Sequence, residues 1–403
     1  MVDSNLRWAE NSSNEHAARR RVVFFIDRVT HYHVQTLRAI EHGLSQRGIA
    51  FTVLSSQDPD GAVGRTGLRG TVTTDHQHFE LTERRVGSFT CRYQHGLLDL
   101  LKKLAPQVIV SCCHAGTVSE WRALLWARRN HVRRVAWQCG FEYNPSTLKN
   151  IVLRSFIPLF DLHLCYHSQA RSYAIKHGAC RSATRVMHNT IDESAIVRQP
   201  HCEAIAALHA RSPESTGKRI VLYVGAILEE KRLDTVFAAL RQLADPAIHF
   251  IIVGDGPYMN VLKQRYAQRT DWSAIGHVVD GVGLYFDAAD VFVLPGTGGL
   301  AINQAMAHGL PVICGYADGS ADDLVTHDVN GLRLQKSSAE ELAGCILELL
   351  SDPNRAAAMG KVGEIRIRRE LTFRRFIDTV VTALAEQAAA VSVAATSAAS
   401  PRA

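Results

Sequence analysis

A lysine and a glycine in the second half of the chain have the types and spacing of a phosphate-binding loop. Gly225 ends an apolar run, and Lys231 follows in the string GAILEEKR. Glycine lets the backbone turn sharply after a strand, and a nearby lysine reaches a phosphate as a compact point charge. The alternative is an ordinary strand-to-helix turn with a solvated Glu-Glu-Lys-Arg face. Lys231 is therefore a candidate catalytic cation only if other loops support it.

A second loop of this kind follows the apolar run IIV. Gly254, Asp255 and Gly256 form a tight turn, and Pro257 suits the first position of a helix. A plain turn is again the alternative, but the second loop repeats the pattern of the first. Both loops are candidate binding sites for a phosphorylated donor.

The third loop joins an apolar strand at residues 291–294 to a helix in the string LPGTGGLAINQAMAHGLPVI. Gly298 and Gly299 allow close backbone approach to a ligand, and Leu300 begins the helix. The N–H groups and the dipole of a helix start favour a diphosphate. Gln304, one helical turn further, is placed to hydrogen-bond a ribose hydroxyl.

The third loop also fits the dinucleotide-binding fingerprint G-x-G-x-x-G/A, with Asp318 about twenty residues further on. That fingerprint normally opens the first strand–helix–strand unit of its domain. Here about four strand-like runs precede it within the same half of the chain. An NAD-type oxidoreductase is therefore kept as an alternative.

Histidines follow strand-like runs in the first half. His31 and His33 stand after the run at 22–26, and His114 stands after the run at 108–112. The carboxyl ends of parallel strands lie along one edge of a sheet, so we expect these histidines on the acceptor side of a cleft. Surface or turn histidines are the alternative. No metal site is expected, because the cysteines lack the spacing of a zinc site.

The elements that must position these residues are short Val- and Ile-rich runs alternating with amphipathic stretches. They include a helix expected over 93–104 and a strand expected at 277–280. This pattern predicts parallel sheets covered by helices on both faces, the doubly wound α/β class. The predicted organisation has a disordered segment at 1–20, a Rossmann-like domain at 21–198 and a linker at 199–218. A second Rossmann-like domain at 219–354, C-terminal helices at 355–388 and a disordered tail at 389–403 follow.

Composition indicates a soluble globular protein, with 46% apolar and 21% charged residues in 403. Neither a signal peptide nor a spanning apolar run is recognisable, and the nine cysteines suggest reduced thiols, so a cytoplasmic location is expected. Residues 1–200 carry 26 Lys and Arg against 16 Asp and Glu, whereas the remainder carries 19 against 23. The basic half indicates an anionic partner such as a membrane surface, or is simply a solvated face. No nucleic-acid-binding motif is apparent.

Together the three loops resemble the retaining glycosyltransferases of the group 1 type (family 4, GT-B fold). GAILEEKR, IIVGDGPY, FDAADVFVLPG and INQAMAHGLPVI stand in the family's order and spacing, and DDLVTHDVNGL also matches. The resemblance covers most of residues 220–350, and VMHNTID at 186–192 is a weaker match. It implies two Rossmann-like domains facing across a cleft, with a C-terminal helix crossing back to the first domain. The resemblance also implies that the domain at 21–198 binds the acceptor and the domain at 219–354 binds the donor. It also implies a nucleotide-diphosphate sugar donor, a glycan or lipid-linked acceptor, and no bound metal or other cofactor.

Three positions depart from the family pattern. Ala226 replaces the usual arginine after the first loop's glycine, and the family's paired glutamates fall on Gly296 and Gln304. The histidine that the family carries near the reacting carbon falls on Cys139 or Gln138. Glu142 lies close by and is our candidate replacement, hence a second candidate catalytic residue.

An active hexosyltransferase, working with retention in bacterial surface polysaccharide or glycolipid synthesis, is the function that the motifs favour. A catalytically impaired family member that binds a sugar nucleotide is the alternative that the departures suggest. Residues 148–160 form an apolar face flanked by Lys149 and Arg154, which fits either core packing or a peripheral helix at the inner face of the plasma membrane.

Overall fold

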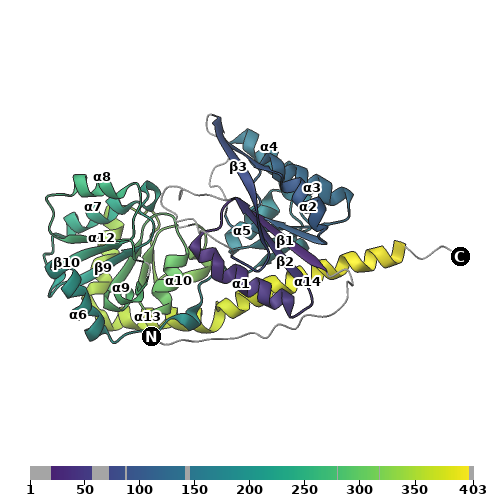
Figure 1. The fold of residues 1–403 in the computed structure, drawn as a ribbon. Helices are drawn as coiled ribbons and strands as arrows, with labels where there is room; N and C mark the ends of the chain where they lie inside the picture. The colour runs from purple at the N-terminus through teal and green to yellow at the C-terminus, as the bar shows by residue number, and fades with distance from the viewer. Residues whose placement is uncertain are drawn as a thin grey trace.

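The computed structural model describes residues 20–56, 72–86, 89–140, 146–278, 280–316 and 318–398. They form two α/β units, each with its own sheet and hydrophobic core, and a long C-terminal helix that reaches from one unit to the other (Figure 1). The expected N-terminal segment at 1–20 lies outside the described residues except for Arg20.

The first sheet has eight strands in the order β4-β3-β2-β1-β5-β6-β7-β8, and the β3–β4 pair is its antiparallel pair. Its central strands are apolar on both faces, because helices cover both sides. The strands are β1 (Arg21–Ile26), β2 (Ala50–Ser56), β3 (His76–Val86), β4 (Phe89–His95), β5 (Val108–Ser111), β6 (Arg133–Gln138), β7 (Leu162–Cys165) and β8 (Thr184–Val186). The α-helices of this unit are α1 (His31–Ser45), α2 (Leu97–Leu104), α3 (Val118–Arg129), α4 (Thr147–Phe156) and α5 (Ser168–Lys176), and its short turns are η1 (Ile157–Leu159), η2 (Arg181–Ala183) and η3 (Glu193–Ala195).

The second sheet has six parallel strands in the order β11-β10-β9-β12-β13-β14. Its strands are β9 (Arg219–Val224), β10 (Ile248–Val253), β11 (Trp272–Gly276), β12 (Val291–Leu294), β13 (Val312–Cys314) and β14 (Gly331–Arg333). Its helices are α6 (His201–Arg211), η4 (Pro213–Ser215), η5 (Glu229–Lys231), α7 (Leu233–Leu243), α8 (Met259–Arg265), α9 (Gly283–Ala288), α10 (Leu300–Ala307), α11 (Ala321–Leu324), α12 (Ala339–Ser351) and α13 (Pro353–Ile365). Strand order reverses between β9 and β12, which places the first and third loops side by side at the switch point.

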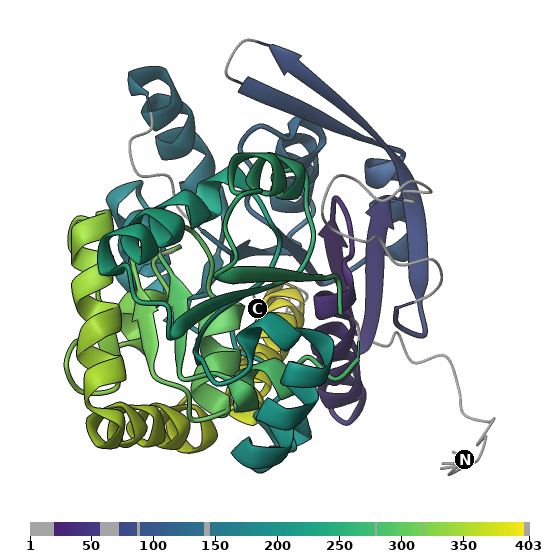
Figure 2. The ribbon, with the colours of Figure 1, turned by 90° about the vertical axis from the view of Figure 1, so that its left-hand side faces the viewer.

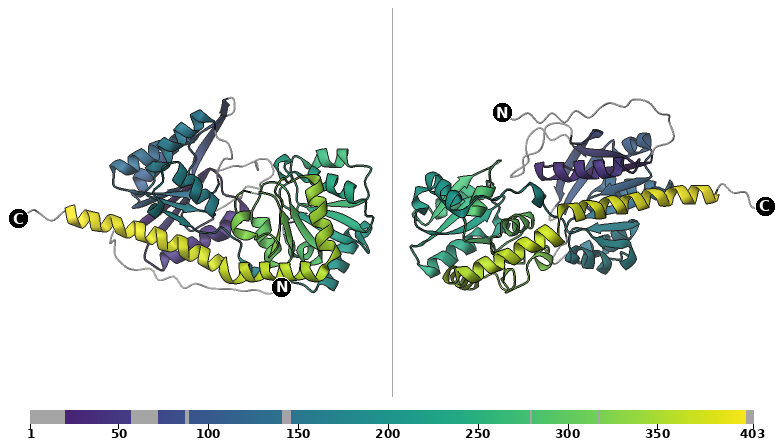
Figure 3. Two further views of the ribbon diagram at one scale, coloured as in Figure 1. Left: turned by 180° about the vertical axis from the view of Figure 1, so that it is seen from behind. Right: turned by 90° about the horizontal axis from the view of Figure 1, so that it is seen from below.

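The crossing helix is α14 (Phe373–Ala398), which follows α13 after a π-helical turn at Arg366–Glu370. Phe376, Val380 and Leu384 are buried in the core of the first unit, although they come from the end of the chain. The helix packs on α1 and runs along the first unit (Figures 1 and 3). The predicted return of the C-terminal helix to the first domain is therefore confirmed.

The largest difference from the sequence pattern is the hairpin of β3 and β4, which the pattern does not predict. One helix over 93–104 is expected, but Tyr93 and His95 pair with Thr82 and Glu80 across the hairpin. Gly96, with φ of 74°, then ends the strand, and α2 begins only at Leu97. Strand pairing within the hairpin outweighs the local helical pattern here. The hairpin extends beyond the neighbouring strands (Figure 2).

Three smaller differences concern boundaries. The span 199–218, expected as a linker, contains α6, which packs against α9 of the second unit. The strand expected at 277–280 is instead β11, the edge strand next to β10. The tail expected to be disordered from residue 389 continues α14 to Ala398, because alanine favours helix even without a core-facing pattern; residues 399–403 lie outside the described part.

Candidate active site

A cleft of about 2590 Å³ lies between the two units, at the carboxyl ends of the strands of both sheets. The second unit contributes every residue predicted for the donor site to its wall: Gly225, Lys231, Gly254, Asp255, Gly256, Gly298, Gly299, Leu300 and Gln304. The first unit contributes His33 and His114. The structure therefore brings the predicted residues of both halves around one cavity, while their chemical roles stay predictions.

Two predicted residues are not described in full. Glu142 lies in the stretch 141–145, outside the described residues, so its candidacy as a catalytic group stays a prediction. His31 begins α1, but its side chain is likewise outside the description.

The first two donor loops are packed backbone against backbone. Gly225 N–H donates to Val253 O at 3.0 Å, and Ile227 N–H donates to Asp255 O at 3.0 Å. A Cβ on Gly254 would lie 1.9 Å from the carbonyl oxygen of Gly225, and one on Gly256 would lie 2.3 Å from that of Ile227. These glycines are required because no side chain fits between the loops.

Lys231 is held against the third loop. Its Nζ donates to the backbone oxygen of Thr297 at 2.8 Å and lies 3.2 Å from Thr297 Oγ1, and its side chain is only 13% exposed. A Cβ on Gly298 would lie 3.8 Å from Nζ. The cation therefore stands beside the glycines at the start of α10, where both favour a diphosphate.

Gly296 has a physical explanation in this arrangement. A Cβ there would lie 2.2 Å from the backbone oxygen of Glu230 and 2.5 Å from the carbonyl carbon of Lys231. Because η5 packs directly on the third loop, residue 296 has no room for a side chain. The carboxylate that the family places at this position cannot be accommodated without moving η5.

The acceptor-side wall carries a network that the sequence did not reveal. Asp27, directly after β1, accepts a hydrogen bond from Gln94 Nε2 at 2.6 Å and lies 3.4 Å from Arg92 NH1 and 3.7 Å from His114 Nδ1. Beneath them, the Glu120 carboxylate accepts hydrogen bonds from Ser111 Oγ at 2.5 Å and from His114 N–H at 3.1 Å. The position of Asp27 after the first strand was a usable signal, whereas Gln94 and Arg92 arrive through the unpredicted hairpin.

These contacts shift the pKa values of Asp27, His114 and Glu120. Burial raises the pKa of Glu120 to about 7, although the charge of His114 and the Ser111 hydrogen bond oppose it. Burial opposes the protonation of His114, but its hydrogen bond to Asp27 and the charge of Glu120 raise its pKa. Burial also acts against the charge of Asp27, yet His114 and Arg92 hold its pKa below the usual value. The acceptor wall thus combines an ionised carboxylate with an imidazole that protonates readily.

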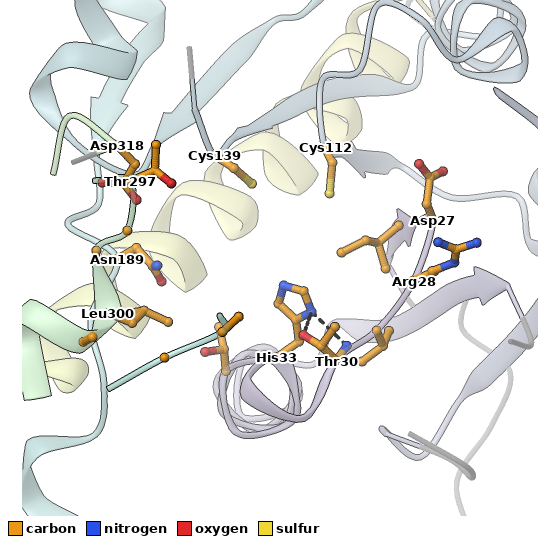
Figure 4. A pocket seen from close by; sticks show the side chains of 18 of the residues that line it. Asp27, Arg28, Thr30, His33, Cys112, Cys139, Asn189, Thr297, Leu300 and Asp318 are labelled. Atoms are coloured by element: carbon orange, nitrogen blue, oxygen red, sulfur yellow. Dashed lines mark hydrogen bonds between the residues drawn. The ribbon is translucent and has the colours of Figure 1, made fainter. Parts of the chain in front are cut away.

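His33 enters the cavity from the first turn of α1 (Figure 4). Its Nδ1 accepts a hydrogen bond from Thr30 N–H at 3.1 Å and lies 3.1 Å from Thr30 Oγ1. Since Nδ1 is an acceptor, the proton of the neutral ring is on Nε2. His33 therefore offers a donor at Nε2 and is not a general base in this state.

The structure distinguishes the two positions proposed for the missing family histidine. Gln138 is buried and donates through Nε2 to Gly140 O at 2.8 Å, whereas Cys139 lines the cleft. Figure 4 shows Cys139 and Cys112 on the first-unit side of the cavity. A hydrogen bond from Cys112 lowers the pKa of the Cys139 thiol although burial opposes this. Of the two residues, Cys139 is therefore the one that faces the cleft, and its equivalence to the family's histidine stays a prediction.

Polar contacts join the two units. Ser168 N–H donates to Asp323 Oδ2 at 2.7 Å, and His188 Nδ1 lies 3.4 Å from the same oxygen. Asn303 Nδ2 donates to Thr190 Oγ1 at 2.9 Å. The two units are therefore joined by specific polar contacts beside the donor wall.

Two Rossmann-like units facing a shared cleft, with a C-terminal helix returning to the first, define the GT-B fold. The crystal structure of Anabaena Alr3699/HepE in complex with UDP has the same fold: its TM-score is 0.71 at 18% identity, over 91% of this chain and 100% of that chain. Residues 205–366 match the family model described as "Glycosyl transferases group 1". The family match in the second unit and the shared fold confirm the resemblance to the group 1 glycosyltransferases and disfavour the dinucleotide alternative.

Curated relatives match about half of this chain or less. The GDP-mannose-dependent alpha-(1-6)-phosphatidylinositol monomannoside mannosyltransferase of Mycobacterium tuberculosis is 32% identical over 186 residues, 41% of this chain and 46% of that protein. The alpha-monoglucosyldiacylglycerol synthase of Streptococcus pneumoniae is 26% identical, over 52% of this chain and 49% of that protein. The chain thus spans about half the length of these curated relatives. Among the described residues, no helix has the length and apolarity needed to cross a bilayer.

Proposed function

We propose that this chain transfers a hexosyl group from a nucleotide-diphosphate sugar to an acceptor held by the first unit. The observation that carries the proposal is the convergence of three glycine-rich loops and Lys231 on one wall of the cleft. The opposite wall presents Asp27, His33 and His114, which suit hydroxyl-rich acceptors because they supply hydrogen-bond donors and acceptors.

The chemistry requires stabilisation of the negative charge that builds on the departing diphosphate. Lys231 Nζ and the N–H groups around Gly298–Leu300 are placed to supply it, without a metal ion. The family match supports retention of configuration at the sugar carbon, and NMR of the product's anomeric proton tests this. An inverted product would contradict that part of the proposal.

A lipid-linked acceptor is the class that the relatives' names favour, since one acts on a phosphatidylinositol mannoside and the other makes a glucosyl diacylglycerol. The surface of α4 supports it: Leu148 and Ile151 are 61% and 59% exposed, next to Lys149 and Arg154. Exposed apolar side chains flanked by cations bind anionic bilayers. We propose peripheral attachment at the cytoplasmic face of the membrane through this helix.

Donor binding is tested first, by thermal shift of the full chain with UDP-, GDP- and dTDP-sugars and with NAD. We expect stabilisation by one class of sugar nucleotide and turnover of that compound with a glycolipid acceptor. Stabilisation by NAD alone would contradict the proposal. Binding without any turnover would favour the impaired family member instead.

Replacement of Lys231 tests the role of the cation. Lys231→Met keeps the apolar stem and should lower kcat/KM by about 100-fold or more, on the order of 2–4 kcal/mol, because one charged donor to the leaving group is lost. Lys102→Met, at a side chain that is 54% exposed on α2, is the matched control. Normal turnover by the Lys231 variant would refute its assignment.

Liposome flotation tests membrane attachment. The full chain should float with vesicles containing anionic phospholipid, and Leu148→Asp with Ile151→Asp should abolish flotation without lowering the melting temperature. Val329→Asp, at an apolar side chain that is 51% exposed on the second unit, is the control. Equal flotation of both variants would remove α4 from the proposal.

A further inference from the structure

A carboxylate of the second unit, that of Asp318, lies on the cleft wall between the donor loops and the first unit. Asp318 stands in the loop between β13 and α11, at the carboxyl end of the sheet, and lines the cavity. Figure 4 shows it beside Thr297, on the wall that also carries Leu300. The sequence pattern singled out Asp318 only as the acidic residue of a dinucleotide site. The match to the group 1 glycosyltransferases disfavours that kind of site.

The carboxylate is fixed in place by its own loop. Ser320 N–H donates to Asp318 Oδ1 at 3.0 Å, and Ser320 Oγ donates to the same oxygen at 2.5 Å. A Cβ on Gly299 would lie 2.8 Å from Asp318 Oδ2 and 2.8 Å from Ser320 Oγ. Gly299 therefore lacks a side chain where this loop approaches the start of α10, and Oδ2 is the oxygen nearer to that helix start.

Asp318 also faces the first unit. Burial lowers the pKa of His167, at the start of α5, and the charge of Asp318 opposes that shift. The charge of Asp318 also acts to raise the pKa of Cys139, whereas the hydrogen bond with Cys112 lowers it. Asp318 lines the same cavity as His167 and Cys139, and it therefore lies at the junction of the two units.

The other carboxylates that the described second-unit residues add to the cleft have local partners. Glu230 Oε1 lies 3.7 Å from Lys231 Nζ, and Asp255 Oδ1 accepts the N–H of Gly256 at 2.7 Å. Asp318 Oδ1 is likewise held by Ser320, but its Oδ2 lies near the start of α10, on the wall of the cavity shared with the first unit. A diphosphate on the amides of α10 puts its sugar in that cavity, since the sugar must lie between leaving group and acceptor.

We propose that Asp318 contacts the transferred sugar of the donor. Its carboxylate accepts hydrogen bonds from ring hydroxyls and stabilises the positive charge that develops on the sugar ring. This assignment rests on the proposed function. In the transfer, the bond between the sugar carbon and the diphosphate breaks, and its electron pair stays on the diphosphate. The acceptor oxygen bonds to that carbon, and the acceptor's proton passes to the departing diphosphate or to water.

The position of this carboxylate also has a consequence for the product. A negative charge near the start of α10 repels a nucleoside diphosphate but is offset by hydroxyl contacts when the sugar is attached. Asp318 therefore favours the sugar nucleotide over the nucleoside diphosphate that remains after transfer. It acts as a specificity group for a hydroxylated sugar and not as a phosphate ligand.

The test compares two ligands on one variant. Isothermal titration measures the affinities of wild-type protein and Asp318→Asn for the sugar nucleotide identified by thermal shift and for the matching nucleoside diphosphate. We expect the sugar-nucleotide affinity to fall about 10-fold or more, because charge-assisted hydrogen bonds to the sugar are lost. The nucleoside-diphosphate affinity should stay unchanged or rise, and kcat should fall further than the sugar-nucleotide affinity. Asp99→Asn, at a side chain that is 83% exposed, is the control.

Unchanged sugar-nucleotide affinity and kcat in Asp318→Asn would overturn the assignment. So would an equal loss for both ligands, because that pattern indicates a structural role. Asp318→Glu is the control for misfolding, because it keeps the negative charge but shifts the carboxylate relative to the sugar hydroxyls. It should retain the nucleoside-diphosphate affinity and lose sugar-nucleotide affinity. A wild-type protein that binds none of the sugar nucleotides would contradict the proposed function itself, and this assignment with it.

Discussion

Alanine at Gly254 tests the close packing of the first two donor loops. The new Cβ would lie 1.9 Å from Gly225 O and 2.9 Å from Gly225 C, and the backbone at Gly254 has φ of 134°. Positive φ costs a non-glycine residue about 1–3 kcal/mol, and forcing an atom into a packed site adds about 1–3 kcal/mol. We therefore expect a total loss of about 2–6 kcal/mol, since the contact is with backbone that cannot rotate away.

Gly276→Ala is the matched control, because Gly276 also has positive φ, 86°, but a Cβ there meets nothing within 4 Å. It should cost only the backbone strain, about 1–2 kcal/mol. Scanning calorimetry of both variants measures the difference, with Gly254→Ala giving at least twice the fall in the melting temperature of the second unit. Equal shifts would refute the packing argument. Gly254→Ala should also lose sugar-nucleotide binding, because its Cβ displaces the second donor loop.

Three further predictions concern pH, closure and the crossing helix. Because the pKa of Glu120 is about 7 in the folded protein and near 4.5 otherwise, stability falls as pH rises between these values. Glu120→Gln should flatten that part of the unfolding profile, and an unaltered profile would contradict it. Asp323→Asn weakens the hydrogen bond with Ser168 that joins the two units. The units should then separate more often and increase the radius of gyration in X-ray scattering, and unchanged scattering would contradict this role of the contact. Leu384→Ala should destabilise the first unit by about 2–5 kcal/mol, measured by calorimetry, because its side chain is buried in that unit's core; a loss confined to the second unit would refute this.

Much of the donor side was predictable from sequence, because its chemistry depends on local strings. Gly225, Gly254 and Gly298 each follow a buried strand, and a glycine at that point can only mean a turn or a close approach. The order of strands and helices then follows from periodicity. In a parallel sheet such loops lie along one edge, so the sequence predicts most of the donor wall of the cleft.

The acceptor side was less predictable, because its network is assembled from distant segments. Asp27, Gln94, His114 and Glu120 come from four different elements, and no spacing in the chain connects them. The hairpin that carries Gln94 contradicts the local helical pattern, and it forms because β4 pairs with β3 and β3 pairs with β2.

The sequence by itself determined the class of fold, the three donor loops and the lysine, because glycine turns, apolar strands and helix starts are local properties of the chain. Tertiary structure alone decided which groups face one another across the cleft. It placed α14 in the core of the first unit, packed η5 where Gly296 leaves no room for a carboxylate, and brought Asp318 to the start of α10. These relations depend on contacts between residues far apart in the chain, and side-chain packing in three dimensions selects them.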